Sequence, residues 1–413
     1  MASNLKNRLQ RIRNMARQET PEPGRSPGIS GETFDSPPGF GDEWAPAGFK
    51  VLKRSVYSKI IFSLPPELPE ELKVLVPDFS KTQPRVITPE ELVFFDLETT
   101  GLSGGAGTTA FLAAFGFFQK RENKKGYSLR TDQYLLLDYP GEADFLESIV
   151  PILGEENKII VTYNGKTFDT KLLRTRCLMN GIRPPEYPEA DLLHPARRLW
   201  KKVLPNCSQA EIEVSVLGLD RTGDVSGAFA PQIWFDFLNS GSPGDLLKIC
   251  GHNQKDIEGL ASMFGLMLNI ASRPLEILPD YTFDIEAVAL KWRDHAKWFP
   301  NDSMIRERAE TLMAFSVREK CPRAMYARGY DLLKKGRHDE GLPLLDELAQ
   351  MDIAVSLKTA VLGCLAMDAE WRLRDAIRAL NYTDALLQTE GLSESFREKA
   401  AVRRERLLKK IVF

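Results

Sequence analysis

The stretch VFFDLETTGL, residues 93–102, places two carboxylates, Asp96 and Glu98, at the end of an apolar run that is typical of a buried strand. Side chains alternate between the two faces of a strand, so residues two apart point the same way. We therefore expect Asp96 and Glu98 side by side on one surface. Because two like charges held together repel each other, this pair requires a cation nearby.

The segments around this stretch alternate between strand and helix patterns, from Glu91 to about Ser272. Strands are predicted at 92–98, 109–118, 127–138 and 158–163. Helices are predicted at 142–153, 168–180, 190–202, 208–217 and 243–270. Three strands with short connections, then a helix and a strand, predict a mixed α/β sheet. In this sheet an antiparallel meander gains a parallel strand beside its first strand.

The beginning of the chain has a different composition from this central region. Residues 1–48 join a basic amphipathic stretch to a segment rich in proline and glycine, and the latter predicts a flexible linker. The basic stretch predicts a short solvated helix with one weakly docked face, or else a segment that binds a membrane surface or nucleic acid. We expect the ordered α/β domain to span residues 49–272.

Strand patterns stop near residue 283, and helical patterns continue from there. Within this part, Gly329 precedes Gly363 by 34 residues. That spacing resembles the tetratricopeptide repeat, in which small residues let two antiparallel helices approach closely. Residues 283–413 are therefore expected to form an all-α domain, either tetratricopeptide-like or an ordinary helical bundle, and able to hold a protein partner.

The composition allows an enzyme of ordinary size. The 413 residues are 43% hydrophobic, which is enough for two cores. Lys and Arg together number 55 against 57 acids, for a net charge of −2. A strongly basic coat for nucleic acid is thereby excluded, so any such binding relies on local patches or on metal.

The five cysteines are widely spaced with no CxxC pair, which argues against both zinc ribbons and disulfide frameworks. No run approaches the roughly 18 apolar residues of a membrane span. The first residues also lack the apolar core of a secretory signal. We expect no membrane span and a cytoplasmic location.

Further acids occur where they could join the first pair. Asp169 opens a predicted helix in TYNGKTFDTKLL (162–173), directly after a strand and an Asn-Gly turn. His252 and Asp256 lie four residues apart in GHNQKDIEGLASM (251–263), and they share one helix face. Each has an ordinary explanation when taken alone, because acids favour the first turn of a helix and paired charges favour its surface.

The order strand-DxE, strand-NGxxFD-helix and helix-HxxxD resembles the DEDD exonuclease superfamily, which has a ribonuclease H-like fold. Four longer segments are similar to its bacterial YprB-type branch: DLETTGLSGGAGTTAFLAAFG (96–116), VTYNGKTFDTKLLRTR (161–176), DLLHPARRLWKKVLPNCSQAEIEVSVLGL (191–219) and HNQKDIEGL (252–260). That branch has a ribonuclease H-like domain followed by tetratricopeptide-like helices. The resemblance covers residues 45–272 well and the rest loosely.

The resemblance implies that Asp96, Glu98, Asp169 and Asp256 hold two Mg²⁺ or Mn²⁺ ions, which prefer oxygen ligands. His252 stands four residues before Asp256, the last of the four acids. One subgroup of the superfamily has a tyrosine at this position. The subgroup that has a histidine usually places it five residues before the last acid. Imidazole titrates near neutral pH and suits deprotonation of water. His252 is therefore a candidate general base, or else it points elsewhere.

The neighbouring segments hold further candidates for binding nucleic acid. Thr99, Asn164 and Lys166 are the candidate substrate contacts, although an Asn-Gly turn explains Asn164 equally well. The glycine-rich stretch 103–109 lacks the Gly-Lys-Ser/Thr ending of a phosphate loop, so it is expected to be a turn beside the metal site or a tight hairpin. Basic side chains between residues 166 and 202 could bind the phosphate backbone of a nucleic acid, or they could face solvent. Trp200 and Trp234 could stack bases or pack in the core.

The sequence therefore predicts a metal-dependent nuclease, a 3′–5′ exonuclease acting on single-stranded DNA or RNA. The polarity comes from the resemblance alone. The alternative is a catalytically quiet ribonuclease H-like adaptor that binds nucleic acid or protein. The presence of all four acids favours the enzyme.

Overall fold

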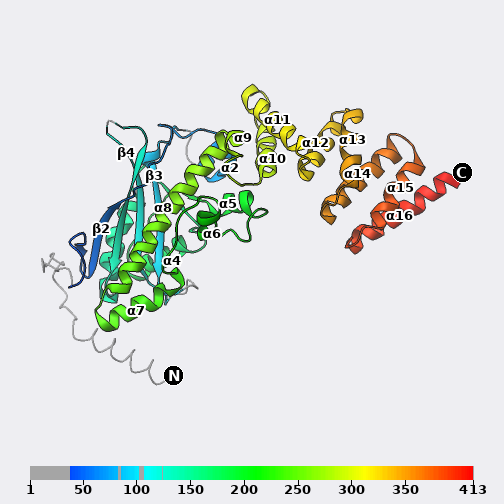
Figure 1. The fold of residues 1–413 in the computed structure, drawn as a ribbon. Coiled ribbons are helices and arrows are strands. Elements are labelled where there is room, and N and C mark those ends of the chain that lie inside the picture. Colours follow the sequence, from blue (N-terminus) through cyan, green and yellow to red (C-terminus); the bar gives the residue numbers. More distant parts are fainter. Residues whose placement is uncertain (1–37, 82–84, 102–106, 123, 413) are drawn as a thin grey trace, which may run out of the picture.

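The computed structural model describes residues 38–81, 85–101, 107–122 and 124–412. Within these residues the chain forms a seven-stranded mixed sheet in the order β1-β2-β5-β4-β3-β6-β7, flanked by helices, and a helical region follows (Figure 1). The basic N-terminal stretch and most of the expected linker lie outside the described residues. The strands are β1 (Ala45–Gly48), β2 (Val51–Tyr57), β3 (Leu92–Thr99), β4 (Ala110–Lys120), β5 (Tyr127–Leu136), β6 (Ile159–Thr162) and β7 (Glu189–Asp191).

The pairing of the strands confirms the predicted mixed sheet. β3, β4 and β5 form an antiparallel meander, and β6 pairs in parallel with β3. β7 then pairs in parallel with β6 at the edge. Residues 189–191 therefore belong to the sheet, and the helix predicted at 190–202 begins only at Leu193.

The sheet also begins earlier in the chain than expected. β1 pairs with β2 in antiparallel orientation, although its residues belong to the stretch 1–48 that the composition assigned to a linker. Trp44 is buried immediately before it, with its ring edge-on to that of Phe40. β1 is an edge strand, where the missing N–H of Pro46 is tolerated. The sheet therefore starts at Ala45 rather than near Phe49.

The helices that cover the sheet come from the segments between and after the strands. They are α2 (Leu72–Leu75), α3 (Glu142–Leu153), α4 (Asp169–Met179), α5 (Leu193–Trp200), α6 (Gln209–Ser215), α7 (Ala230–Ser240), α8 (Gly244–Ser272) and α9 (Pro274–Ile277). The short 3₁₀ turn η4 (Gly227–Phe229) precedes α7. The sequence patterns did not predict the helix α7.

Alternation along β3 divides the core into two apolar clusters. Val93, Phe95 and Leu97 pack with side chains of α3, α4 and α7 on one face. Leu92 and Phe94 pack with side chains of α8 on the other. Because residues two apart share a face, the two carboxylates of β3 are directed to the α8 side.

The region after α9 consists of helices joined by short connections. These are α10 (Ile285–Ala296), α11 (Ser303–Arg318), α12 (Pro322–Lys334), α13 (His338–Gln350), α14 (Val355–Trp371), α15 (Ala376–Leu387) and α16 (Glu394–Val412). A Cβ added at Gly329 would lie 2.8 Å from Leu345 Cδ2, so glycine lets α12 and α13 approach closely. A Cβ at Gly363 would meet nothing within 4 Å, so the second glycine has no such role. The tetratricopeptide-like assignment stays a prediction.

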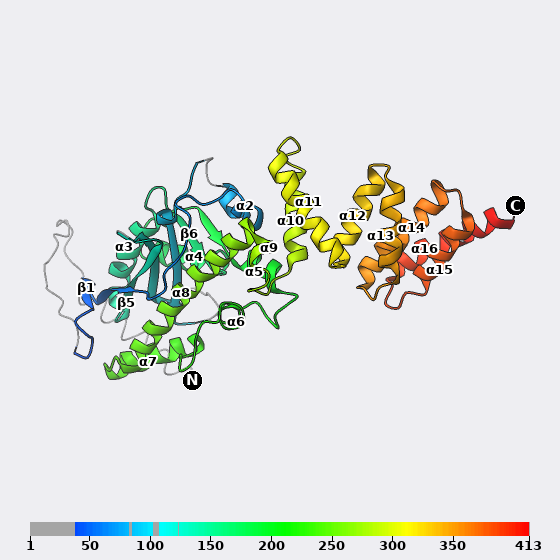
Figure 2. The same ribbon diagram turned by 45° about the horizontal axis from the view of Figure 1, so that its top comes forward.

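The helical region and the sheet share part of one core. Trp292 of α10 and Leu312 of α11 belong to the same apolar cluster as Phe94 of β3. α12 contributes Ala324 to this cluster and Met325 to the cluster of the terminal helices. The helices from α13 onward extend away from the sheet (Figure 2). The division of the chain into 1–48, 49–272 and 283–413 stays a prediction.

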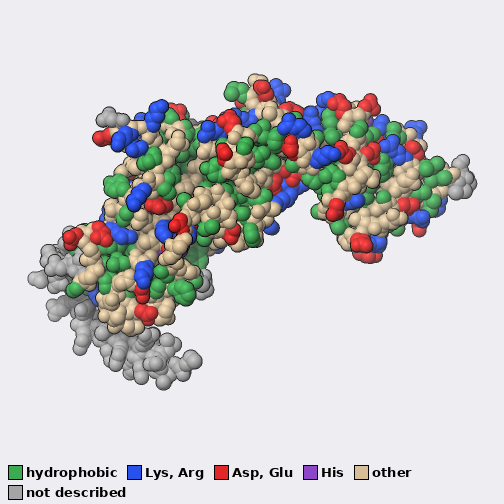
Figure 3. Space-filling model, in the orientation of Figure 1, with side chains coloured by type: hydrophobic (Ala, Val, Ile, Leu, Met, Phe, Trp, Pro, Cys, Tyr) green, Lys and Arg blue, Asp and Glu red, His purple; other side chains and the backbone are tan. Residues whose placement is uncertain are grey.

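The surface carries charges of both signs. Basic and acidic side chains are interspersed on the face drawn in Figure 3, in keeping with the small net charge. In the part of the chain that the structure describes, no helix is long and apolar enough to cross a membrane. The cysteines are free thiols.

Candidate active site

The pair Asp96 and Glu98 lies where β3 meets α8, with Glu98 buried and Asp96 partly buried. Glu98 is only 9% exposed. Burial raises the pKa of Asp96 well above its ordinary value, and the nearby carboxylates of Asp256 and Asp169 raise it further. The same causes, in the same order, raise the pKa of Glu98. These shifts show that the acids of three elements lie within electrostatic reach of one another.

Asp169 is the first residue of α4 and is 7% exposed. Burial raises its pKa to about 8, with a further contribution from the neighbouring carboxylate of Glu189. The Asn-Gly turn that leads into α4 has Asn164 in the left-handed region, at a φ of 68°. That conformation suits asparagine, so the chain turns sharply between β6 and the first residue of α4.

Asp191 organises this turn. Its Oδ1 accepts hydrogen bonds from the backbone N–H of Asn164 at 2.8 Å and of Leu193 at 3.0 Å. Asp191 therefore links the turn before α4 to the start of α5. A buried carboxylate with several backbone donors supports the site without facing substrate.

His252 and Asp256 share one face of α8, as their spacing predicts. His252 Nε2 lies 3.3 Å from Asp256 Oδ2, and its Nδ1 lies 3.0 Å from Asp224 Oδ2. One ligand atom each from Glu98, His252 and Asp256 can be chosen so that all three lie within 4.8 Å of one another. The structure therefore brings His252 to the acids.

Two residues that the sequence reasoning missed, Arg221 and Asp224, lie between α6 and η4. Arg221 Nη2 donates to Asp256 Oδ1 at 2.5 Å, and its Nη1 donates to Asp224 Oδ2 at 2.7 Å. Its Nε donates to the fully buried Glu213 at 2.8 Å. Burial raises the pKa of Asp224, but hydrogen bonds from His252 and Arg221 outweigh burial and leave it below its ordinary value. No motif spacing marks either residue.

A chain of buried amides positions Asp96. Asn253 Nδ2 donates to Asp96 Oδ2 at 2.7 Å, and Gln133 Nε2 donates to Asn253 Oδ1 at 2.8 Å. Arg54 Nε in turn donates to Gln133 Oε1 at 2.7 Å. Asn253 and Gln133 are both fully buried, so their amides are fixed by these bonds. The sequence reasoning missed this chain because its members lie on three separate elements.

The three candidate substrate contacts all have partners within the protein. Thr99 Oγ1 donates to the carbonyl oxygen of Gly101 at 2.9 Å. Asn164 Oδ1 accepts from Thr167 Oγ1 at 2.5 Å, and Lys166 pairs with the carboxylate of Asp78. Their contact with substrate stays a prediction. Residues 102–106 of the glycine-rich segment lie outside the described residues.

Several of the basic and aromatic candidates have structural roles instead. Arg176 forms a buried pair with Glu142. Arg198 donates to the Leu75 carbonyl at 3.1 Å. Trp200 and Trp234 are fully buried, so they pack in the core and cannot stack on a base. Burial follows from their place on helices that cover the sheet.

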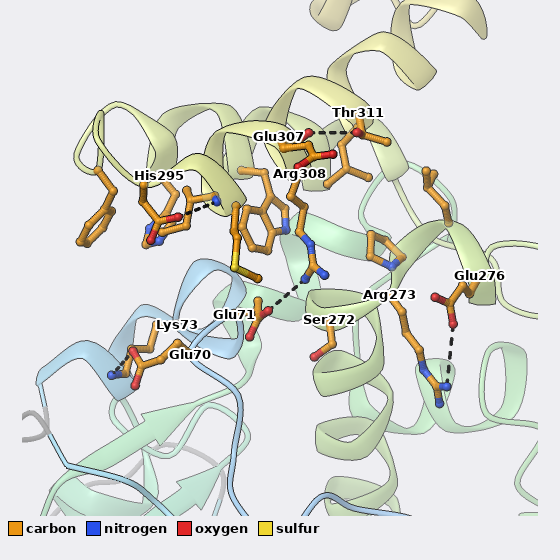
Figure 4. Close-up of a pocket in the computed structure, with 18 of the residues that line it drawn as sticks. Glu70, Glu71, Lys73, Ser272, Arg273, Glu276, His295, Glu307, Arg308 and Thr311 are labelled. Atoms are coloured by element: carbon orange, nitrogen blue, oxygen red, sulfur yellow. Dashed lines mark hydrogen bonds and ion pairs between the residues drawn. The ribbon is translucent and has the colours of Figure 1, made fainter.

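A cavity of about 930 Å³ lies away from these acids, among α2, the end of α8 and the hairpin of α10 and α11 (Figure 4). Several of its charged side chains form ion pairs, such as Arg308–Glu71 at 3.1 Å and Lys73–Glu70 at 2.5 Å. Ser272 lines it, and that residue is about 24 Å along α8 from Asp256. The cavity is thus separate from the acid cluster, by which we mean Asp96, Glu98, Asp169 and Asp256.

The acid cluster fits a divalent cation. Carboxylate oxygens are the ligands that hard cations prefer, and a cation would relieve the repulsion that raises the pKa of Asp96 and Glu98. A Cβ added at Gly227 would lie 3.1 Å from His252 Nε2 and 3.9 Å from Glu98 Oε1. Glycine at this position therefore leaves open the space beside these two ligand atoms.

The mixed sheet with acids on β3 and α8 is of the ribonuclease H-like class. The family model for the RNase_H superfamily matches residues 93–268, which contain β3, the start of α4 and most of α8. Over 328 residues, the chain is 32% identical to the uncharacterized protein YprB of Bacillus subtilis, covering 77% of this chain and 75% of YprB. The chain belongs to the YprB family of ribonuclease H-like proteins.

These comparisons confirm the predicted YprB-type resemblance and fold class. Ribonuclease H-like domains generally act on nucleic acid with divalent metal ions, and most hydrolyse phosphodiester bonds. A nuclease-type function related to nucleic acid is therefore supported at the level of the superfamily.

Proposed function

We propose that the protein is a metal-dependent phosphodiester hydrolase that removes nucleotides from the 3′ end of single-stranded DNA or RNA. One observation supports this most strongly. Glu98 on β3 and His252 and Asp256 on α8, far apart in the chain, offer ligand atoms within 4.8 Å of one another. The carboxylates of Asp256 and Asp169 also raise the pKa of Asp96 and Glu98. Without a cation such a cluster is unfavourable, so its assembly points to a site for divalent ions.

The proposed ligands are Asp96, Glu98, Asp169 and Asp256, with His252 as the fifth residue of the site. Two Mg²⁺ or Mn²⁺ ions held there would lower the pKa of an attacking water and stabilise the departing 3′ oxygen. Asn253 holds Asp96 in one orientation through its 2.7 Å hydrogen bond. Arg221 engages Oδ1 of Asp256, which leaves Oδ2 directed toward His252.

The rigidity of the supporting elements favours catalysis. Asp96 and Glu98 lie on a central strand with hydrogen-bonded neighbours on both sides. Asp169 is held at the start of a helix by the turn that Asp191 ties. A site built on such elements keeps its groups in place when charge develops in the transition state. In this proposal, the terminal helices that extend from the sheet hold a protein partner.

The test is digestion of single-stranded DNA and RNA oligonucleotides, labelled at either end, with Mn²⁺, Mg²⁺ or chelator. We expect metal-dependent shortening from the 3′ end, which Asp96→Asn and Asp256→Asn abolish. Asp245→Asn is the matched control, because this acid is also on α8 but its side chain is 69% exposed. Binding of the oligonucleotides without shortening, in every metal, would favour the adaptor instead.

A further inference from the structure

The ring of His252 is held in one orientation by Asp224. Nδ1 lies 3.0 Å from Asp224 Oδ2, and the same oxygen accepts from Arg221 Nη1 at 2.7 Å. An ionised carboxylate has no proton to give, so Nδ1 is the donor of this bond. In the neutral ring the other nitrogen, Nε2, then carries a free lone pair.

That lone pair faces a second acceptor. Nε2 lies 3.3 Å from Asp256 Oδ2, and the other oxygen of Asp256 already accepts from Arg221 at 2.5 Å. Two acceptors at this separation repel each other unless a positive centre lies between them. A proton on Nε2 could also lie between them, but 3.3 Å is longer than the roughly 2.7–2.9 Å of a charge-assisted hydrogen bond, so the geometry suits a shared cation better than a bond between the two side chains.

Glu98 completes the same small space from the sheet. Its ligand oxygen, His252 Nε2 and an oxygen of Asp256 lie within 4.8 Å of one another. The backbone of η4 closes one side at Gly227, where a Cβ would stand only 3.1 Å from Nε2. Any larger residue at Gly227 would therefore crowd the ligand atoms.

We propose that His252 Nε2 is a direct ligand of a divalent ion shared with Glu98 and Asp256, and that this ligand makes the site prefer Mn²⁺ to Mg²⁺. The assignment rests on the proposed function only in that the acids hold a cation. It replaces the role of general base that the motif suggested for His252. Imidazole binds transition-metal ions well, whereas Mg²⁺ strongly favours oxygen ligands.

Asp224 is the positioning residue in this arrangement. A carboxylate behind a metal-binding histidine fixes the ring and makes its free nitrogen more basic, and loss of such a partner costs about 10- to 100-fold in metal affinity. Asp224→Asn should therefore weaken Mn²⁺ binding while leaving His252 itself in the chain.

The experiment measures binding of Mn²⁺ and Mg²⁺ to the full chain by calorimetry and, for Mn²⁺, by electron spin echo spectroscopy. His252→Gln should weaken Mn²⁺ binding by about 10-fold or more and remove the imidazole nitrogen modulation from the echo. Its affinity for Mg²⁺ should change by less than about 3-fold. Asp224→Asn should lower Mn²⁺ affinity by about 10-fold. His194→Gln, on an exposed position of α5, is the matched control and should bind as the unaltered protein does.

Two results would overturn the inference. Nitrogen modulation that survives in His252→Gln, or an unchanged Mn²⁺ affinity in that variant, would show that His252 is not a ligand. If either accompanied metal-dependent digestion by the unaltered protein, only the ligand assignment would fail. If the unaltered protein bound neither ion, the proposed function would fail with it.

Discussion

Replacement of Asp169 by asparagine should stabilise the metal-free protein, and more so as the pH rises. Asp169 is buried at the start of α4, and burial and the carboxylate of Glu189 raise its pKa to about 8 from an ordinary value of 3.8. In the unfolded chain this acid ionises above its ordinary pKa, whereas in the folded protein it keeps its proton until about pH 8. The unaltered protein therefore loses stability as the pH rises through this window. The amide that replaces the carboxyl group has no proton to lose, so the variant would escape that loss.

The two pKa values of Asp169 determine the size of the effect. Each pH unit between them changes the free energy of unfolding by about 1.4 kcal/mol. From about pH 5 to about pH 8 the advantage of the variant should therefore grow by roughly 4 kcal/mol.

Urea unfolding of both proteins in chelator, across this pH range, measures the difference. Asp245→Asn on α8 is the control, because its exposed side chain should change stability by less than about 0.5 kcal/mol. With saturating Mn²⁺ the order should reverse, since the unaltered protein would retain a ligand that the variant lacks. A difference that stays constant or shrinks as the pH rises would refute the reasoning.

Four further substitutions have expected outcomes. Gly329→Ala should lower the free energy of unfolding by about 1–3 kcal/mol in urea, because its Cβ would lie 2.8 Å from a leucine of α13. Gly363→Ala has open space around it and should raise stability by about 0.5–1 kcal/mol. Arg221→Ala should cost about 3–5 kcal/mol by the same measurement, because it leaves the buried glutamate of α6 without its cation. Asn253→Ala should weaken Mn²⁺ binding by about 10-fold in calorimetry, because Asp96 loses its donor.

β3 and β4 could be predicted because most of their side chains are apolar, and β5 because its apolar residues alternate with polar ones and then form a short apolar run. β2 could not, since Lys53 and Arg54 interrupt its pattern. Arg54 is accommodated by lying over the ring of Trp44 at 4.8 Å and donating to Gln133. Such compensation depends on partners that are distant in the chain, so local sequence carries no sign of it.

Asp96, Glu98 and Asp169 could be named as candidates because they occur where a strand ends or a helix begins, and Asp256 because it lies four residues after His252 on a predicted helix. Arg221 and Asp224 occur on an irregular connection, where neither helical nor strand periodicity applies. Their importance comes from contacts with Asp256 and His252, residues that meet them only after folding. A single sequence shows the candidate ligands, but it does not show the side chains that orient them.

α12 has apolar side chains on both sides, with Ala324 in the cluster beneath the sheet and Met325 in that of the terminal helices. A helix that packs in two cores at once forms a rigid connection between them, because bending the helix would disrupt the packing of one core or the other. A protein partner bound by the terminal helices would therefore be held at a fixed distance and orientation from the carboxylates. If the proposed function holds, the length of the helical region would then set the distance between a bound partner and the site of hydrolysis.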